Sequence, residues 1–324
     1  MLDDTQREEV YLPILIEETH SIEEVFAKFL RRDVANGDAS EDTLRGYRAQ
    51  VQQWVLWCQE MSISPMKATV DDVIDYRQAL LHTKKYKPAT IAHKLTILRQ
   101  FYAALIAHGL RIDNPVAGLR APRAKRSQED FKYLSEVDYT ILLRSVGKEN
   151  GVHALRDRVL LTLMGLQGLR TIECERANVE DLRLNGEVYS LLVRGKNHDR
   201  VLYLRQDVAT TLHRYLALRE NAITDQDGTP LFTARGNRAA NRRLTRRGIR
   251  FIVDGYLKKA DLKKPGISDH ALRHTAATLA YKYTQDLRSV QEMLGHADPK
   301  TTARYAHVID RMRNNPANAI PIEW

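Results

Sequence analysis

The segment Ser268–Tyr305 reads SDHALRHTAATLAYKYTQDLRSVQEMLGHADPKTTARY and gathers an unusual set of side chains. His270 and Arg273 are three residues apart, so on a helix they share one face. His296 follows a glycine typical of a helix end, and Tyr305 comes nine residues later in a helix-compatible run. This set suits in-line attack by a tyrosine on a phosphodiester, because cationic groups can neutralise the extra negative charge on the five-coordinate phosphorus.

Composition favours a globular, intracellular protein. The chain has 324 residues, enough for two domains, with 43% hydrophobic and 28% charged residues. Cys58 and Cys174 are its only cysteines, too few for a disulfide framework or a cysteine-based metal site. The polar N-terminus is unlike a secretory signal, and no apolar run approaches the roughly 20 residues of a membrane span. We expect a cytoplasmic, nucleoid-associated protein without a membrane partner.

Basic residues are concentrated in one segment of the chain. The formal net charge is +9, and 11 basic residues lie between Arg235 and Lys264, opposed only by Asp254 and Asp261. A solvated helix face could carry such charges, but their density favours nucleic acid as a partner.

The first hundred or so residues predict a small helical bundle. Residues 1–20 lack a strong period and indicate a loose lead-in. Ser21 is expected to cap the helix SIEEVFAKFL, with Glu24 completing a capping box. Three further helices are expected in TLRGYRAQVQQWVLWCQEM, in ATVDDVIDYRQALL after its cap Thr69, and in KPATIAHKLTILRQFYAALIAHG, which ends at Gly109.

The start of the fourth helix carries groups that could lie over phosphates or in a major groove, or could simply be solubilising. These residues are Lys84, Lys85, Lys87, Thr90, His93 and Lys94.

The segment NPVAGLRAPRAKRSQ has proline, glycine and basic residues without periodicity, which indicates an interdomain linker. We place the linker at residues 121–132, between a helical domain at 1–120 and a second domain at 133–324.

The second domain is predicted to be mostly helical with a small antiparallel sheet. Ser135 is expected to cap a helix, and ALRDRVLLTLMGLQGLR indicates an apolar helix that stops near Gly168. GEVYSLLVRGKNHDRVLYLR predicts a β-hairpin with Lys196 in its turn. Residues 207–218 indicate another helix, followed by the extended segment GTPLF. The expected fold class is therefore mainly α with a small antiparallel β-sheet.

These segments resemble the tyrosine recombinases, also called the phage-integrase family. GLRTIE matches the family's first arginine and its acidic companion, GKNHDR the hairpin lysine, HALRH the His-x-x-Arg box, and LGHADPKTTARYAHV the closing histidine and nucleophile. The match spans about residues 133–310, and the N-terminal region resembles the family's SAM-like core-binding domain more loosely. The matched positions are Arg170, Glu173, Lys196, His270, Arg273, His296 and Tyr305.

Some of these residues also fit structural roles. Arg170 could be a cation at a helix C-terminus, with Glu173 as its ion-pair partner. Asp269 with two nearby histidines could imitate a metal site, but the flanking arginine would repel a divalent ion. Packing or surface roles are expected for His274 and His307, and core packing for Tyr281 and Tyr283.

The resemblance implies a covalent mechanism without a cofactor. A free tyrosine has a pKa near 10, so about a thousandth is phenolate at neutral pH and the phenol must be activated. By the resemblance, His270 is the base, and Arg170 and Arg273 bind the non-bridging oxygens. His296 adds a hydrogen bond there, and Lys196 protonates the departing 5′ oxygen. The product is a 3′-phosphotyrosyl link, which stores the bond energy, so neither ATP nor metal is needed.

The resemblance also implies the partners. The two domains would clamp double-stranded DNA with inverted-repeat core sites, and four protomers would exchange strands through a Holliday junction, as a homotetramer or with a related recombinase. An accessory DNA-binding protein could take part. The segment LTRRGIRFIVDGYLKKADL resembles the family's helix that enters DNA. The DNA contacts expected around its start are Arg242, Arg243, Thr245, Arg246 and Arg247.

Several alternatives remain open. The C-terminal Ile320, Ile322 and Trp324 could dock into a neighbouring subunit or fold onto their own domain. The activity could serve integration, excision, or the resolution of cointegrates and dimers. A topoisomerase of type IB and a non-catalytic DNA-binding regulator with the same fold are the competing functions.

Overall fold

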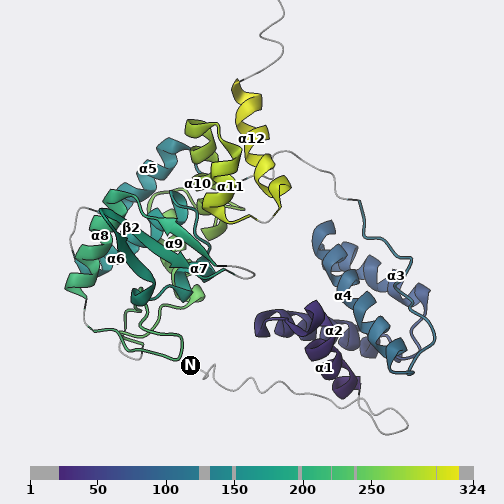
Figure 1. Cartoon of the computed structure of the whole chain (residues 1–324). Coiled ribbons are helices and arrows are strands. Elements are labelled where there is room, and N and C mark those ends of the chain that lie inside the picture. The colour runs from purple at the N-terminus through teal and green to yellow at the C-terminus, as the bar shows by residue number, and fades with distance from the viewer. Residues whose placement is uncertain are drawn as a thin grey trace, which may run out of the picture. The chain divides into compact units, whose positions relative to one another are not determined.

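A computed structural model describes residues 22–123, 132–147, 151–195, 199–219, 221–236, 239–296 and 298–313. The chain divides into two compact units, Met1–Ser127 and Gln128–Trp324. Helices α1 to α4 belong to the first unit, and α5 to α12 with the sheet belong to the second (Figure 1). Predictions for Ser21, Lys196, Ile320, Ile322 and Trp324 lie outside the described residues, as does the side chain of His307.

The first unit is the predicted four-helix bundle. Its helices are α1 (Ile22–Arg32), α2 (Glu41–Glu60), α3 (Val70–Gln78) and α4 (Pro88–Ala107), with short helical turns η1 (Val34–Gly37) and η2 (Ala79–Thr83). Ser40 and Thr69 cap α2 and α3, and Thr69 forms a capping box with Asp72. In the core, the indole of Trp54 donates to the hydroxyl of Tyr102 at 3.1 Å, and that hydroxyl donates to the carbonyl of Pro65 at 2.9 Å, so these buried polar groups are satisfied internally.

The first part of the predicted linker segment packs onto this unit. The side chain of Asn114 donates to the carbonyl of Arg99 at 2.9 Å, and Val116 is fully buried. Arg99 in turn donates to the carbonyl of Leu119 at 2.9 Å. Residues 114–119 are therefore part of the helical unit rather than a free connection, because Arg99 of α4 accepts from the Asn114 side chain and donates to the backbone of Leu119.

The second unit is helical around a three-stranded antiparallel sheet in the order β1-β2-β3. The sequence predicts the β2–β3 hairpin, in which Leu191 pairs with Leu202, but not β1, whose Leu182 pairs with Leu191. The strand β1 is short and mostly exposed, so it lacks the alternation that identifies a strand. The strands are β1 (Leu182–Asn185), β2 (Val188–Val193) and β3 (Arg200–Tyr203).

The helices of the second unit surround α6, which packs against α8, α9 and α10. Ser135 caps α5 as predicted, through a hydrogen bond from the amide of Asp138 at 3.1 Å. The helices are α5 (Glu136–Ser145), α6 (Val152–Gly165), α7 (Thr171–Arg176), α8 (Gln206–Leu218), α9 (Arg246–Lys259), α10 (Asp269–Thr284), α11 (Leu287–Leu294) and α12 (Pro299–Arg313), with a 3-10 turn η4 (Val179–Asp181).

One glycine decides how α6 leads into α7. Gly168 has φ +73°, and a Cβ there would lie 2.5 Å from a methyl carbon of Leu294 at the end of α11. A side chain at residue 168 would therefore strain the turn and push α11 away. The close approach places the turn before α7 against the end of α11, and α10, α11 and α12 pack against one another.

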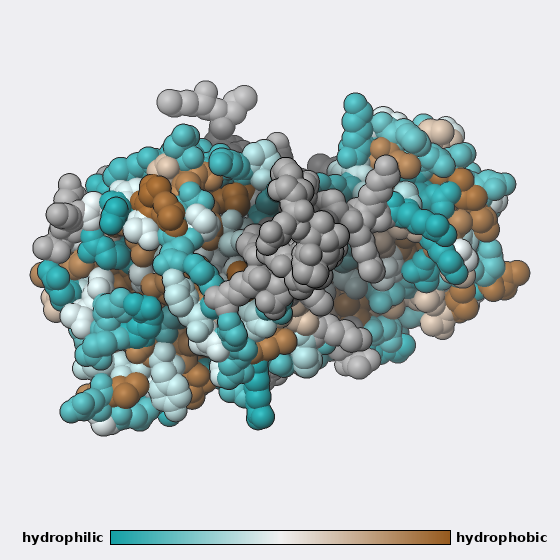
Figure 2. Space-filling view, turned by 90° about the horizontal axis from the view of Figure 1, so that it is seen from above, coloured by the Kyte–Doolittle hydropathy of each residue, from teal (hydrophilic) through white to brown (hydrophobic). Residues whose placement is uncertain are grey.

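The surface in Figure 2 intersperses hydrophobic residues with hydrophilic ones. Within the described ranges, none of the helices has the length and apolar character needed to cross a bilayer.

Candidate active site

Glu173 lies at the centre of an arginine cluster. Its side chain is fully buried and accepts from Arg170 at 2.7 Å and from both terminal nitrogens of Arg200 at 2.9 and 3.0 Å. Arg273 lies 3.8 Å away. Burial alone would raise the pKa of Glu173, but the hydrogen bonds and charge of Arg200 outweigh it and lower the pKa to about 2. The carboxylate thus stays ionised and holds three guanidinium groups together.

The local fold of α7 explains why Arg170 and Glu173 are three residues apart. Arg170 is the N-cap of α7, and its backbone N–H donates to Glu173 at 2.8 Å. The same carboxylate therefore caps the helix and orients the Arg170 side chain, which is 35% exposed. The alternative role of Arg170 as a C-terminal cation is wrong, because α6 ends with its C-cap at Leu166.

Arg273 ties three elements together. From α10, its guanidinium donates to the carbonyl of Gly168 and, at 2.7 Å, to the carbonyl of Leu294. The residue is 3% exposed, and burial and the charge of Arg170 lower the pKa of its guanidinium to about 10. The guanidinium therefore remains charged at neutral pH in a fixed orientation beside the Glu173 carboxylate.

The start of α10 is anchored by Asp269. Its carboxylate accepts from the hydroxyl of Thr171 and, at 3.3 Å, from the Nε of Arg250. His270 follows at the exposed start of the helix, and partial loss of water around its ring, together with the charges of Arg273 and Arg170, lowers the pKa of its imidazole. In the part of the chain that the structure describes, no three His, Cys, Asp or Glu side chains are placed to hold a metal ion.

His296 sits in the turn between α11 and α12. Its Nδ1 lies 2.9 Å from the hydroxyl of Thr302, and its backbone N–H donates to the carbonyl of Gln291 at 3.2 Å. Burial and the charge of Arg273 lower the pKa of its imidazole to about 4, so the ring is neutral at neutral pH. The ring is nearly parallel to that of Tyr305, with centroids 6.4 Å apart.

Tyr305 lies on α12 with 2% of its surface exposed. Burial raises the pKa of its phenol, although the charges of Arg273, Arg304 and Arg170 oppose the effect. Its hydroxyl lies 3.0 Å from Nδ1 of His274. The structure thus brings Arg170, Arg273, His296 and Tyr305 into one region.

Sequence reasoning missed two residues of this region. His274 was expected to pack or to lie at the surface, yet it contacts the hydroxyl of Tyr305. Arg200 follows the GKNHD segment, and its guanidinium donates two hydrogen bonds to the carboxylate of Glu173. In β3, Arg200 and Leu202 are the less exposed residues and alternate with exposed Val201, so the alternation of the strand could have indicated an inward-facing arginine.

The two other tyrosines of α10 have polar partners. Tyr283 is 67% exposed and donates to Glu136 at 2.7 Å, so its predicted core packing is wrong. Tyr281 is partly buried, and its hydroxyl lies 3.3 Å from the carboxylate of Asp310.

Most of the predicted DNA contacts of the first unit are on its surface. Lys94 is the exception and requires a correction. It is 4% exposed, donates to Gln50 and Gln53, and lies over the ring of Tyr86 at 5.0 Å. Its ammonium is therefore used inside the bundle, and burial lowers its pKa. The exposed members of the set are Lys84, Lys85, Lys87, Thr90 and His93.

Around the start of α9, the predicted contacts differ in their availability. Arg242 and Arg247 are exposed. Arg246 pairs with Glu175 at 3.0 Å, and the hydroxyl of Thr245 accepts from the amide of Gly248 as the cap of α9. Arg243 is the least available.

Arg243 is held by several partners. It pairs with Asp225 at 2.7 Å and donates to Asn178 at 2.8 Å, so its guanidinium joins the surrounding loops. Its side chain is 13% exposed. This geometry makes Arg243 a structural residue in the DNA-free protein rather than a surface contact.

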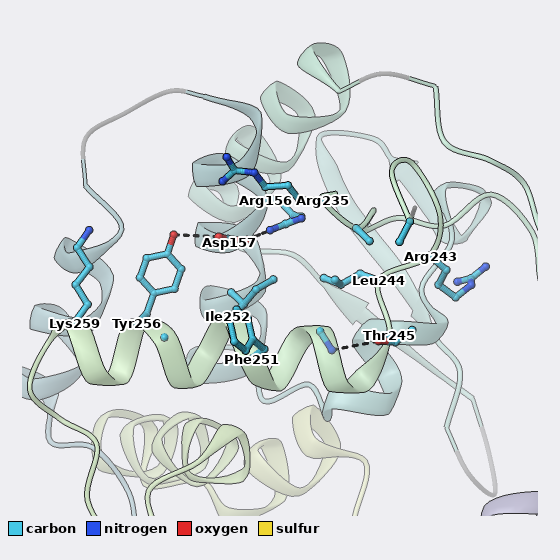
Figure 3. A pocket seen from close by; sticks show the side chains of 14 residues that line it. Arg156, Asp157, Arg235, Arg243, Leu244, Thr245, Phe251, Ile252, Tyr256 and Lys259 are labelled. Carbon is cyan, nitrogen blue, oxygen red and sulfur yellow. Dashed lines mark hydrogen bonds and ion pairs between the residues drawn. The ribbon is translucent and has the colours of Figure 1, made fainter. Parts of the chain in front are cut away.

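Arg243 and Thr245 also line a cavity of about 500 Å³ beside α9 (Figure 3). Its far wall holds the buried pair of Arg156 and Asp157, 2.7 Å apart. Figure 3 shows the hydroxyl of Tyr256 directed at Asp157, 3.0 Å away. The polar groups of this wall satisfy one another, and the cavity shares no residue with the arginine cluster around Glu173.

Comparisons with known proteins match segments of both units to one family. Residues 132–312 match the phage integrase family, and residues 26–109 match the phage integrase N-terminal SAM-like domain. The chain is 31% identical over 290 residues to tyrosine recombinase XerD of Rhizobium meliloti (strain 1021), covering 87% of this chain and 90% of that protein. It is 29% identical over 286 residues to tyrosine recombinase XerC of Staphylococcus carnosus (strain TM300), covering 87% and 92%.

A solved structure has the same fold. The XerH site-specific recombinase, bound to its palindromic difH substrate in a post-cleavage complex, gives a TM-score of 0.71 at 19% identity over 92% of this chain and 84% of that one. With the family match extending over more than half of its length, the chain belongs to the phage integrase family and is a tyrosine recombinase.

Proposed function

We propose that this protein is a site-specific DNA recombinase that cleaves and rejoins strands through a 3′-phosphotyrosyl intermediate. The observation that carries the proposal is the convergence of α7, α10, α11 and α12, in which Arg273 bridges Gly168 and Leu294 close to Tyr305. A phenol enclosed among charged guanidinium groups and neutral imidazoles suits attack on phosphorus, where negative charge increases in the transition state.

The residue roles are those that the resemblance to the family implies, and the charge and exposure of the side chains are compatible with them. Arg170, the more exposed arginine, would meet a non-bridging oxygen first, and Arg273 would bind from the interior. His296 would add a hydrogen bond to the phosphate. His270, on the exposed start of α10, is the proposed base.

The covalent step balances without an external reagent. The phenol oxygen of Tyr305 forms a bond to phosphorus as the bond from phosphorus to the 5′ oxygen breaks. The phenol proton passes to His270, and Lys196 gives a proton to the departing 5′ oxygen. Attack by a 5′ hydroxyl of a second duplex reverses the step and joins new strands, with a Holliday junction after one pair of exchanges.

The assembly is proposed by analogy with relatives. XerH is bound to a palindromic substrate, and a lambda integrase tetramer is bound to a Holliday junction. We infer that this chain likewise binds inverted-repeat core sites and acts as a tetramer, either of itself or with a related recombinase. Such an assembly could serve integration, excision or the resolution of dimers and cointegrates.

The proposed DNA contacts are exposed cations and the face of α9. In the first unit they surround the start of α4, with Lys84, Lys85, Lys87, Thr90 and His93. On α9, Arg247 and Arg250 are exposed, and Phe251 is 81% exposed. An exposed aromatic side chain next to arginines can contact a thymine methyl while the arginines bind phosphate.

The test is covalent trapping of DNA. Duplexes that the protein binds are first selected from a random pool, and a nick is placed beside the presumed cleavage position so that the short 5′ end diffuses away. Wild-type protein should form an adduct that survives denaturation, and Tyr305→Phe should form none while binding DNA normally. Tyr283→Phe is the matched control, because its hydroxyl binds Glu136 outside the site, and it should remain active.

The competing functions give different results. A DNA-binding regulator would trap no DNA in any variant. A topoisomerase would relax supercoiled plasmids that lack the selected site. An adduct in Tyr305→Phe at the wild-type level would refute the assignment of the nucleophile.

A further inference from the structure

The hydroxyl of Tyr305 is held by a residue that the proposed mechanism does not use. His274 lies on α10, one residue after Arg273 and four after His270, and its Nδ1 is 3.0 Å from the Tyr305 oxygen. The two rings are tilted by 49°, with centroids 5.8 Å apart. The contact crosses from α10 to α12, which pack against each other.

Both partners of this hydrogen bond are neutral in the DNA-free protein. Burial and the neighbouring charges of His270, Arg304 and Arg273 lower the pKa of His274 to about 4. Burial raises the pKa of the Tyr305 phenol. At neutral pH the hydrogen bond therefore joins a neutral imidazole to an intact phenol, and no charge is neutralised by the contact.

A hydrogen bond of this kind can fix orientation. The phenol of Tyr305 is almost completely buried, and His296 lies nearly parallel to its ring on another side. With the ring held in place, the torsion angle of the hydroxyl sets the directions of its proton and its lone pairs. The hydrogen bond to His274 turns the hydroxyl towards α10. The same helix carries Arg273, whose positive charge lowers the pKa of Tyr305 against the larger effect of burial. Orienting a nucleophile before reaction removes part of the entropic barrier.

We propose that His274 is a positioning residue for the nucleophile: its imidazole Nδ1 holds the Tyr305 hydroxyl on the α10 side of the site, ready for the phosphate. This inference rests on the proposed recombinase function. It assigns no proton transfer to His274, so an amide that occupies the same place can replace the imidazole.

The test compares three substitutions in the adduct assay. His274→Ala should slow adduct formation about 10- to 100-fold with DNA affinity unchanged, because the phenol loses its orientation. His274→Asn places an amide where Nδ1 stood, and should return the rate to within a few-fold of wild type. His274→Gln reaches the place of Nε2 instead, and should remain slow. A merely structural role would give the opposite order, because glutamine is closer to histidine in volume than asparagine is and would fill the space better.

A second measurement reads the contact without DNA. With 3-fluorotyrosine at position 305, the fluorine NMR resonance should move in His274→Ala and His274→Gln and stay near the wild-type position in His274→Asn. An unmoved resonance in His274→Ala would show that the hydrogen bond is absent in solution, and would overturn the proposal.

Each kinetic outcome is decisive. Adduct formation in His274→Ala at the wild-type rate overturns the proposal, and so does equal slowing in the Asn and Ala variants. A faster His274→Ala would show that the contact restrains the nucleophile instead of preparing it, and also overturns the proposal. Absence of adduct in the wild-type protein is a separate result, which refutes the recombinase function on which the inference rests.

Discussion

Replacement of Glu173 by glutamine should destabilise the second unit strongly. The carboxylate is fully buried between Arg170, Arg200 and Arg273, at 2.7, 2.9 and 3.8 Å. An amide keeps the shape of the side chain but leaves three guanidinium groups without their shared anion. Breaking a buried ion pair by removing one partner costs about 3–5 kcal/mol in the free energy of unfolding.

The pKa of Glu173 supports the same magnitude. The difference between the ordinary value of 4.5 and the folded-state pKa of about 2 corresponds to about 3 kcal/mol. Because the folded-state pKa is depressed, this stabilisation is complete above about pH 4.5 and is lost as the pH falls towards 2. Wild-type protein and Glu173→Gln should therefore differ fully at pH 7 and converge in acid.

The assay is urea unfolding followed by two signals. Circular dichroism reports the helices of both units, and tryptophan fluorescence in a Trp324→Phe background reports the first unit, which holds Trp54 and Trp57. Glu173→Gln should shift the second-unit transition only. Glu292→Gln is the matched control, because its pair with Arg288 is exposed and should contribute less than about 1 kcal/mol. An equally small loss in Glu173→Gln would show that the buried carboxylate does not stabilise the arginine cluster.

Two further predictions concern DNA binding and pH. Arg247→Ala should weaken DNA binding and reduce the slope of log affinity against log salt by about 0.9, whereas Lys94→Met should leave the slope unchanged because its ammonium is internal; equal slopes in both variants would contradict the assignment. The imidazoles of His274 and His296 have folded-state pKa values of about 4 against an ordinary 6.5, so their stabilising contribution is complete above about pH 6.5 and lost as the pH falls towards 4. The free energy of unfolding of the second unit in urea should fall as the pH is lowered across this interval, and it should fall less in His296→Gln. A free energy that does not change with pH would contradict the burial of these rings.

Local sequence spacing predicts the parts of the site that one element builds. The three-residue interval between Arg170 and Glu173 is a helix cap, so their pairing follows from local structure. Arg273 likewise lies one turn from His270 on a single helix, α10. The pairing of Arg200 with Glu173 instead requires β3 to lie beside α7. The contact of His274 with Tyr305 requires α10 to pack on α12. Sequence spacing does not encode these tertiary contacts.

The error at Lys94 has a local cause. Ile91, Leu95 and Leu98 are buried on α4, and Lys94 falls on the same face at helical spacing. The helical period therefore indicated an inward-facing position, but the positive charge suggested a surface residue. Two glutamines of α2, Gln50 and Gln53, accept from the ammonium and make its burial possible.

The most direct test of Tyr305 as the nucleophile is to identify the residue that becomes joined to DNA. Wild-type protein is trapped on the nicked duplex and digested with protease and nuclease, and the nucleotide-bearing peptide is sequenced by mass spectrometry. A single modified residue is expected, Tyr305, linked to a 3′ phosphate. Modification of another tyrosine such as Tyr281, or a link to a 5′ phosphate, would contradict this expectation.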